Sequence, residues 1–147
     1  MYYFAYGSNM SFDHMRKICG WHFSAVGQAT LENFVPGVDF RGYINIKEHK
    51  GGKVLGVLYN IDEKGLEALD EFEGVPDVFK RIEVEVLDES QEKYLAWVYL
   101  QSQEQFGGDY IREEYLNRVI LGARENHLPE DWIEYLESFR ANNGQEK

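Results

Sequence analysis

Short β-rich stretches separated by turn-forming residues fill the middle of this chain of 147 residues. Val, Ile, Tyr and Phe are frequent in each stretch, and Gly, Pro, Asn or Asp lies at the boundaries, which is typical of strands joined by turns. An aromatic run at residues 2–6 precedes them and predicts a first strand. The other predicted strands are residues 22–34, 43–46, 53–60, 79–87 and 94–100. We therefore expect the middle of the chain to be mostly sheet.

Helical patterns lie on both sides of these strands and once between them. Apolar residues recur at helical spacing in four segments, and residues that favour helix ends lie at their boundaries. The predicted helices start after Ser11, at Asp62, at Asp109 and at Pro129, and they end at Gly20, Gly74, about Arg124 and Phe139. Ser and Asp side chains can cap the first two helices, and a proline suits the first position of the last one.

One carboxylate of the second predicted helix lies on its apolar face. Steps of 100° place Glu73 about 20° from Leu66, on the same side as Leu69. A carboxylate that faces a core must be paired, hydrogen-bonded or protonated, and burial raises its pKa toward the range that suits proton transfer at neutral pH. Alternatively, Glu73 turns sideways to solvent from the helix end, or pairs with Lys80 or Arg81.

The first predicted strand runs directly into the small residues Gly7, Ser8 and Asn9. A strand, a tight turn and a helix start bring several backbone N–H groups into one concavity, which can bind a carboxylate or a polarised carbonyl oxygen. The segment lacks the Gly-Lys-Ser/Thr of a phosphate-binding loop and the flanking glycines of a nucleophile elbow. Taken alone, the segment is also typical of a plain turn.

Composition restricts the partners of the chain. The formal net charge is −11, so the averaged surface repels nucleic acids and anionic lipids. No apolar run approaches the roughly 20 residues that span a bilayer, and the N-terminal residues lack the pattern of a signal peptide. We therefore expect a cytoplasmic protein that binds neither nucleic acid nor membranes.

The length predicts one domain, at residues 1–140, and a flexible C-terminal tail at residues 141–147. Cys19 is the only cysteine, which excludes an internal disulfide and favours a role in the core. The four histidines have neither the helical pairing nor the cysteine neighbours of zinc or iron sites. We expect no metal and no other cofactor.

Three segments, in this order and at these separations, give the chain a family resemblance. They are YFAYGSNM at residues 3–10, LDEFEGV at residues 69–75 and GARENHLP at residues 122–129. Together they resemble the γ-glutamylcyclotransferase family and its AIG2-like relatives over residues 2 to about 136. The resemblance implies an α+β fold, a small mixed β-barrel with helices packed around it.

The resemblance also implies roles for individual residues. In the family, the backbone of the YGSN turn holds the γ-glutamyl part of the substrate, and the glutamate of the EG pair is the catalytic acid and base. The implied catalytic residue is Glu73, and the implied substrate-binding residues are Tyr3 on the aromatic strand, then Tyr6, Gly7, Ser8, Asn9 and Tyr115. Tyr115 also fits an ordinary packing face of its helix.

Two features depart from the family pattern. Phe79 stands where relatives often carry a tyrosine after the EG pair, and it cannot hydrogen-bond a substrate. Gly51-Gly52 and the short loop before it leave less structure to cover the leaving-group half of the pocket.

The implied function is cyclisation of a γ-glutamyl amide. The α-amine of the substrate attacks its own side-chain carbonyl, forms 5-oxoproline and expels an amine or amino acid, while one carboxylate moves the protons. The turn N–H groups either hold the α-carboxylate or stabilise the oxyanion. Two alternatives remain: release of another leaving group, such as that of a γ-glutamylamine, and a non-catalytic module that binds a small molecule in the same pocket.

Overall fold

A closed β-barrel forms the centre of the computed structural model, which describes residues 1–141, with the backbone alone at Gln103. Its strands are β1 (Tyr2–Ala5), β2 (Phe23–Val38), β3 (Ile44–Ile61), β4 (Lys80–Asp88) and β5 (Lys93–Leu100). They follow the order β1-β3-β2-β4-β5 around the barrel. Because β1 is parallel to β5 and its other pairing is antiparallel, the sheet is mixed. The α+β barrel expected from the family resemblance is confirmed.

One strand differs from the sequence prediction. Residues 43–46 and 53–60 were expected to form separate strands joined by a loop, but β3 continues through Gly51-Gly52. The β2–β3 register shifts here, since Glu32 pairs with Lys53 whereas Phe34 pairs with Glu48. Gly51 has φ 84°, and its N–H donates to Asn33 Oδ1 at 3.0 Å. The glycines therefore form an irregularity within a strand, where a sequence pattern indicates a turn.

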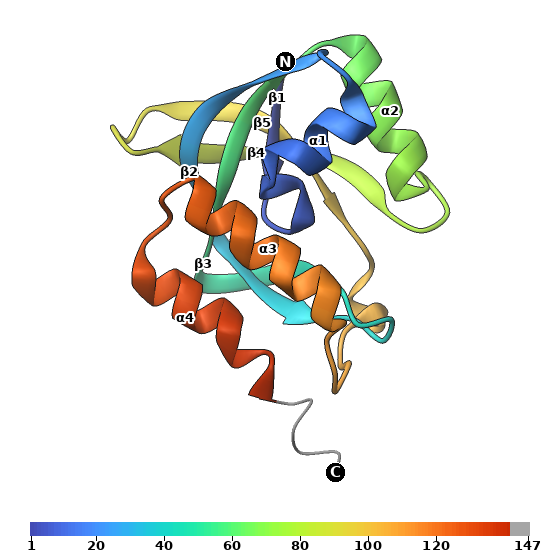
Figure 1. Ribbon diagram of the computed structural model, residues 1–147, viewed down its shortest axis with the longest axis vertical. Coiled ribbons are helices and arrows are strands. Elements are labelled where there is room, and N and C mark those ends of the chain that lie inside the picture. Colours follow the sequence, from blue (N-terminus) through green and yellow to red (C-terminus); the bar gives the residue numbers. More distant parts are fainter. Residues whose placement is uncertain (142–147) are drawn as a thin grey trace.

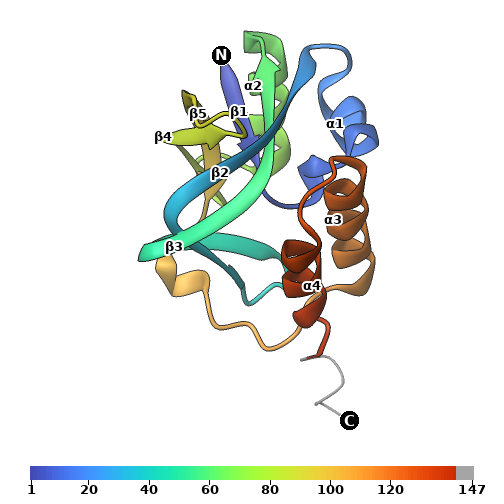
Figure 2. The same ribbon diagram turned by 90° about the vertical axis from the view of Figure 1, so that its left-hand side faces the viewer.

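The helices lie outside the barrel, and Figure 2 shows α1, α3 and α4 on one side of it. They are α1 (Phe12–Cys19), α2 (Glu63–Glu73), α3 (Glu113–Glu125) and α4 (Glu130–Ser138), with short 3₁₀ turns η1 (Ser8–Met10) and η2 (Gln103–Gln105). Figure 1 shows α1 beside α2, and α3 beside α4. Helix α3 also packs on η1, which places the opening turn between the barrel and a helix.

Local capping explains most of the predicted helix ends. Ser11 Oγ accepts from His14 N, and Asp62 Oδ1 accepts from Gly65 N. Gly74 ends α2 in the left-handed conformation, with φ 72°.

The predicted starts of two helices, α3 and α4, were wrong. Helix α3 begins at Glu113 rather than at residue 109, and Pro129 is the N-cap of α4 with extended ψ of 143° rather than its first helical residue.

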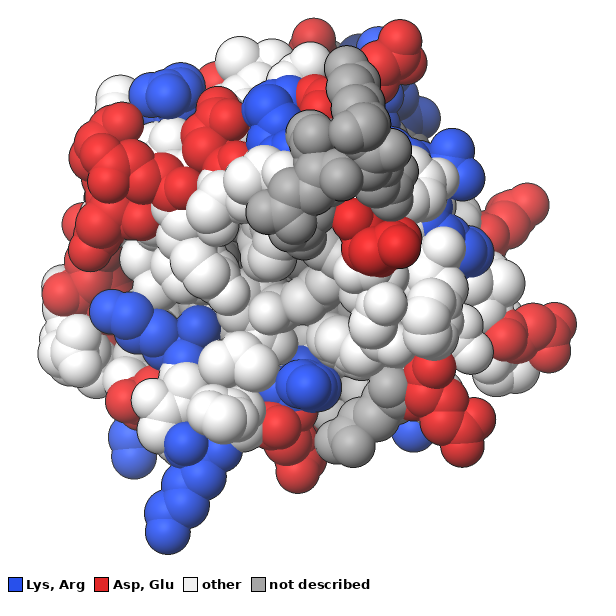
Figure 3. Space-filling view, turned by 90° about the horizontal axis from the view of Figure 1, so that it is seen from below, with Lys and Arg blue, Asp and Glu red and all other residues white. Residues whose placement is uncertain are grey.

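Charged side chains of both signs are distributed over the surface. Figure 3 shows acidic and basic groups interspersed around one face, with uncharged surface between them.

Among residues 1–141, no helix is long and apolar enough to cross a membrane. Cys19 is buried, as expected for a core position. Apart from Ala141, the tail predicted at residues 141–147 lies outside the described residues.

Candidate active site

A pocket of about 340 Å³ lies between the end of β1, the C-terminus of α2 and the flank of α3. All seven site residues predicted from the sequence line it: Tyr3, Tyr6, Gly7, Ser8, Asn9, Glu73 and Tyr115. Segments that are distant in the sequence therefore meet in one concavity. The size suits a small molecule rather than a polymer.

Glu73 is the last residue of α2 and is partly buried in the pocket wall. Its Oε1 lies 3.4 Å from Asn9 Nδ2. Burial raises the pKa of Glu73 to about 7, although the Asn9 hydrogen bond and the positive charge of Arg41 both act to lower it. A carboxyl group with this pKa exchanges its proton readily at neutral pH.

Asn9 connects the opening turn to Glu73. Besides the contact with Glu73, its Nδ2 donates to Tyr3 Oη at 2.8 Å, and its backbone carbonyl accepts from Tyr59 Oη at 2.8 Å. Asn9 and Tyr3 are almost fully buried, and the Tyr3 ring packs edge-on against Tyr99 at a centroid distance of 5.7 Å. The aromatic strand thus forms a rigid wall behind the carboxylate.

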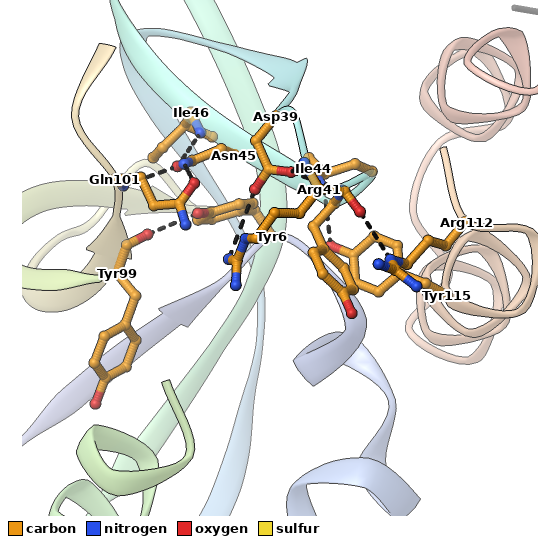
Figure 4. A network of polar contacts seen from close by, with 11 residues as sticks. Tyr6, Asp39, Arg41, Ile44, Asn45, Ile46, Tyr99, Gln101, Arg112 and Tyr115 are labelled. Atoms are coloured by element: carbon orange, nitrogen blue, oxygen red, sulfur yellow. Dashed lines mark hydrogen bonds and ion pairs between the residues drawn. The ribbon is translucent and has the colours of Figure 1, made fainter. Parts of the chain in front are cut away.

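A side chain at position 7 would collide with a neighbouring side chain, so packing rather than backbone conformation favours glycine there. A Cβ at this position would lie 2.9 Å from Tyr115 Oη. That hydroxyl accepts from Ile44 N at 3.3 Å, and its ring packs edge-on against Tyr43 at 4.9 Å. Tyr115 is thus hydrogen-bonded at the pocket wall as well as packed on α3 (Figure 4).

The third segment of the family resemblance, residues 122–129, packs against the end of the opening turn and hydrogen-bonds to it. A Cβ on Gly122 would lie 2.6 Å from Ser11 N, so only a glycine lets α3 approach this closely. Asn126 Nδ2 donates to the carbonyl of Met10 at 2.8 Å. Within η1, the first hydrogen bond is donated by Met10 N to Gly7 O at 3.1 Å. The N–H groups of Ser8 and Asn9 precede that bond, as at the start of any helix.

The alternative ion pair of Glu73 with Arg81 does not occur. Arg81 Nε instead lies 3.1 Å from Asp70 Oδ1, and Tyr99 Oη donates to the same oxygen at 2.7 Å. Asp70 lies about one turn before Glu73 on α2. It is partly buried and paired, and its partners come from strands that the helical pattern alone cannot place.

Several pocket residues were not predicted. They are His14, Arg41, Tyr43, Ile44, Phe72, Gly74, Val78, Tyr99 and Arg118. Phe72 and Gly74 flank Glu73 in the second segment of the resemblance, and the others come from separate elements that no local motif marks. Phe79, where the sequence departs from the family pattern, places an apolar ring in the wall. Burial, with the charges of Arg118 and Lys17, lowers the pKa of His14 to about 4, so this imidazole is neutral at pH 7.

The arrangement provides a proton-transfer group next to hydrogen-bonding backbone. Within the described part of the chain, no group of three or more His, Cys, Asp or Glu side chains is placed to hold a metal ion. Glu73 can accept or donate a proton, while the turn and the tyrosines can orient a polar ligand beside it. Such a site suits a reaction that needs a proton to be both accepted and donated.

Comparisons with known proteins match most of this chain. The family model described as "Gamma-glutamyl cyclotransferase, AIG2-like" matches residues 3–117. The chain is similar to the gamma-glutamylcyclotransferase of Homo sapiens, with 28% identity in an alignment 155 residues long. This alignment covers 95% of this chain and 79% of the relative. It is also similar in fold to a solved gamma-glutamyl cyclotransferase, with a TM-score of 0.87, 24% identity, and coverage of 95% of this chain and 88% of the other. YkqA from Bacillus subtilis aligns with a TM-score of 0.82 and 26% identity, over 94% of this chain and 53% of its own.

Proposed function

The chain belongs to the AIG2-like gamma-glutamyl cyclotransferase family, and from this premise we propose that it cyclises γ-glutamyl amides to 5-oxoproline, with Glu73 as the acid and base. The observation that carries the proposal is the position of Glu73. Its carboxyl group has a pKa of about 7 and contacts the opening turn in one pocket.

The reaction needs no covalent bond to the protein. The substrate α-nitrogen forms a bond to the side-chain carbonyl carbon, and the amide bond to the leaving nitrogen breaks. The attacking amine loses a proton and the leaving amine gains one, so protons balance. The pocket contributes by holding amine and carbonyl at about 3 Å in a folded conformation.

Glu73 performs both proton transfers in this proposal. As a carboxylate it accepts the proton of the attacking amine, and as a carboxylic acid it returns a proton to the leaving nitrogen. With a pKa of about 7, neither form is strongly disfavoured at neutral pH. Asn9 Nδ2, at 3.4 Å from Oε1, orients the carboxylate.

The opening turn binds the glutamyl half of the substrate. Gly7 and Ser8 carry little bulk, so substrate atoms can approach the backbone N–H groups there. Tyr115 and Tyr6 are held by hydrogen bonds to the backbone at Ile44 and Tyr99, respectively, which keeps this half of the pocket in one shape.

The direct test is to incubate the purified protein with a panel of γ-glutamyl amides and to measure 5-oxoproline. We expect release by the wild type and a decrease in kcat of about 100-fold or more in Glu73→Gln, because the amide cannot transfer the proton. Unchanged circular dichroism and thermal unfolding of the variant serve as the folding control. Ligand binding without product from any amide would instead indicate a binding module.

The pH profile tests the role of Glu73 separately. The accepting form is the carboxylate, so kcat/KM should fall as the pH is lowered through about 7. Rates measured between pH 5 and 9 on one substrate would show this decrease. A kcat/KM that stays nearly constant down to pH 5, as a glutamate with the usual pKa of about 4.3 would give, would contradict a buried base.

A further inference from the structure

Arg41 lies where the pocket opens into a neighbouring groove. It belongs to the connection between β2 and β3, and it lines both the pocket and the groove. Val78 and Phe79 also line both. The pocket also shares His14, Phe72 and Arg118 with a second groove, beside α1 and α3. The two arginines therefore border different grooves.

A buried carboxylate fixes the segment that carries Arg41. Asp39 is only 1% exposed, and its Oδ1 accepts from the backbone N–H groups of Arg41 at 2.9 Å and Tyr43 at 3.0 Å. Its Oδ2 lies 3.8 Å from Arg41 Nη2. Figure 4 shows Asp39 directly beside the guanidinium. The backbone at position 41 is therefore held in place.

The guanidinium is oriented but still accessible. Gln101, also buried, lies beside both groups: with its amide nitrogen toward Asp39 Oδ2 at 3.0 Å its oxygen faces Arg41 Nη2 at 2.7 Å, and in the opposite orientation its oxygen accepts from Asn45 Nδ2 at 2.9 Å. The carbon centre of the guanidinium lies 5.2 Å from the Tyr43 ring centroid and 5.8 Å from that of Phe79. The Arg41 side chain nonetheless remains 44% exposed.

Part of the hydrogen-bonding capacity of Arg41 is unused. Both polar side-chain contacts involve Nη2, so among residues 1–141 Nε and Nη1 have no hydrogen-bond partner. A guanidinium presents its donors as a planar fork, which matches the two oxygens of a carboxylate. Arg41 can therefore bind a ligand carboxylate without giving up its contact with Asp39.

The position of Arg41 relative to Glu73 indicates which part of a ligand it meets. Its charge is near enough to act on Glu73. If the glutamyl half lies at the opening turn, as the proposed function requires, the leaving group extends past Glu73 toward Phe79 and the shared groove. The rings of Tyr43 and Phe79 beside the guanidinium reduce its hydration and strengthen its attraction for an anion.

We propose that Arg41 is a specificity-determining residue that binds a carboxylate on the leaving amine. Arg41 thereby selects γ-glutamyl compounds whose leaving amine carries a carboxylate over those with a neutral or cationic leaving amine. This proposal rests on the proposed function and adds to it the residue that selects the leaving group.

The test uses two substrates that differ only by this carboxylate, γ-glutamyl-alanine and γ-glutamyl-ethylamine. For the wild type, kcat/KM should be at least about 10-fold higher for γ-glutamyl-alanine. In Arg41→Gln the ratio of kcat/KM for γ-glutamyl-alanine to that for γ-glutamyl-ethylamine should fall by about 10- to 100-fold, and any loss common to both substrates measures the effect of the missing charge on Glu73. Arg41→Lys should give an intermediate value for γ-glutamyl-alanine, because it keeps the charge but loses the fork.

Arg124→Gln is the matched control, because it removes one positive charge at a surface pair with Glu130, outside the pocket. It should not alter the ratio of the two rates. Equal losses for both substrates in Arg41→Gln would show an effect through Glu73 and would overturn the proposal. So would a wild type without preference for the carboxylate.

Calorimetric binding of the same two compounds to the wild type and to Arg41→Gln separates this proposal from the proposed function. If neither compound yields 5-oxoproline but γ-glutamyl-alanine binds more tightly through Arg41, the cyclisation is wrong and the carboxylate site stands. If both are cyclised and Arg41→Gln has no selective effect, the cyclisation stands and the carboxylate site is wrong. Absence of product and of Arg41-dependent binding would overturn both.

Discussion

Asp70 and Glu73 lie about one turn apart on α2, but their surroundings differ. Asp70 Oδ1 accepts from Tyr99 Oη at 2.7 Å and pairs with Arg81 Nε at 3.1 Å. Glu73 forms no ion pair within the described part of the chain, and its one hydrogen bond, from Asn9, measures 3.4 Å. With only an amide donor and a more distant positive charge near it, the Glu73 carboxyl group keeps an exchangeable proton.

The two carboxylates also face different parts of the molecule: Asp70 faces the barrel strands, and Glu73 faces the pocket. Asp70 joins α2 to β4 and β5 through Arg81 and Tyr99, and the Arg81 guanidinium lies 4.2 Å from the Trp97 ring centroid. Glu73 faces the pocket at the helix end. One carboxylate therefore stabilises the assembly of the barrel and α2, and the other is available for chemistry.

The largest expected effect is the contrast in turnover between neutral variants of these two residues. Glu73→Gln should lose about 100-fold or more in kcat, whereas Asp70→Asn should remain within about fivefold of the wild type, because it leaves the proton-transfer group intact. Parallel assays of 5-oxoproline release give the comparison. A loss in Asp70→Asn as large as that in Glu73→Gln would remove the distinction.

The next effect is a pH-dependent gain in stability for Glu73→Gln. The pKa of Glu73 is raised in the folded state to about 7, so its ionisation favours unfolding as the pH rises from about 4.5 to 7. The neutral variant avoids this cost and should be more stable than the wild type by about 1–3 kcal/mol at pH 8. At pH 4, where the carboxyl group is protonated in both states, the difference should disappear.

Urea unfolding of both proteins at pH 4, 6 and 8 measures this difference, with the m-value as a check that the unfolded states are comparable. A difference that is constant with pH would mean that Glu73 is not destabilised by ionisation.

The sequence could predict the structural features that depend on residues close together along the chain, such as the ends of α2. Asp62 and Gly74 delimit α2 because capping uses backbone groups within a few residues. The same local periodicity placed Glu73 on the apolar face. By contrast, the continuity of β3 through Gly51 depends on Asn33 in the opposite strand, which no local pattern contains.

Only the part of the pocket that the family motifs mark was predicted from the sequence, and helical periodicity supported Glu73 alone. The opening turn and Glu73 were found from the sequence, but Arg41 was not, since its orientation depends on Asp39 and on Gln101 beyond β5. The pairing of Asp70 was missed for the same reason, because Tyr99 and Arg81 reach it only after the barrel has closed. Long-range contacts therefore determine both the charge pairing and the outer half of the pocket.

The smallest expected effect is the loss of stability caused by Asp70→Asn. The Asp70 and Arg81 side chains are 25% and 24% exposed, so solvent weakens the pair, and Arg81 keeps its contact with Trp97. The free energy of unfolding should fall by about 1–2 kcal/mol. Tyr99→Phe, which removes only the hydroxyl hydrogen bond, should lose about 1 kcal/mol or less. If Asp70→Asn unfolded at the same urea concentration as the wild type at pH 7, the pair would contribute nothing measurable, and the two carboxylates would then differ in chemistry but not in their effect on the fold.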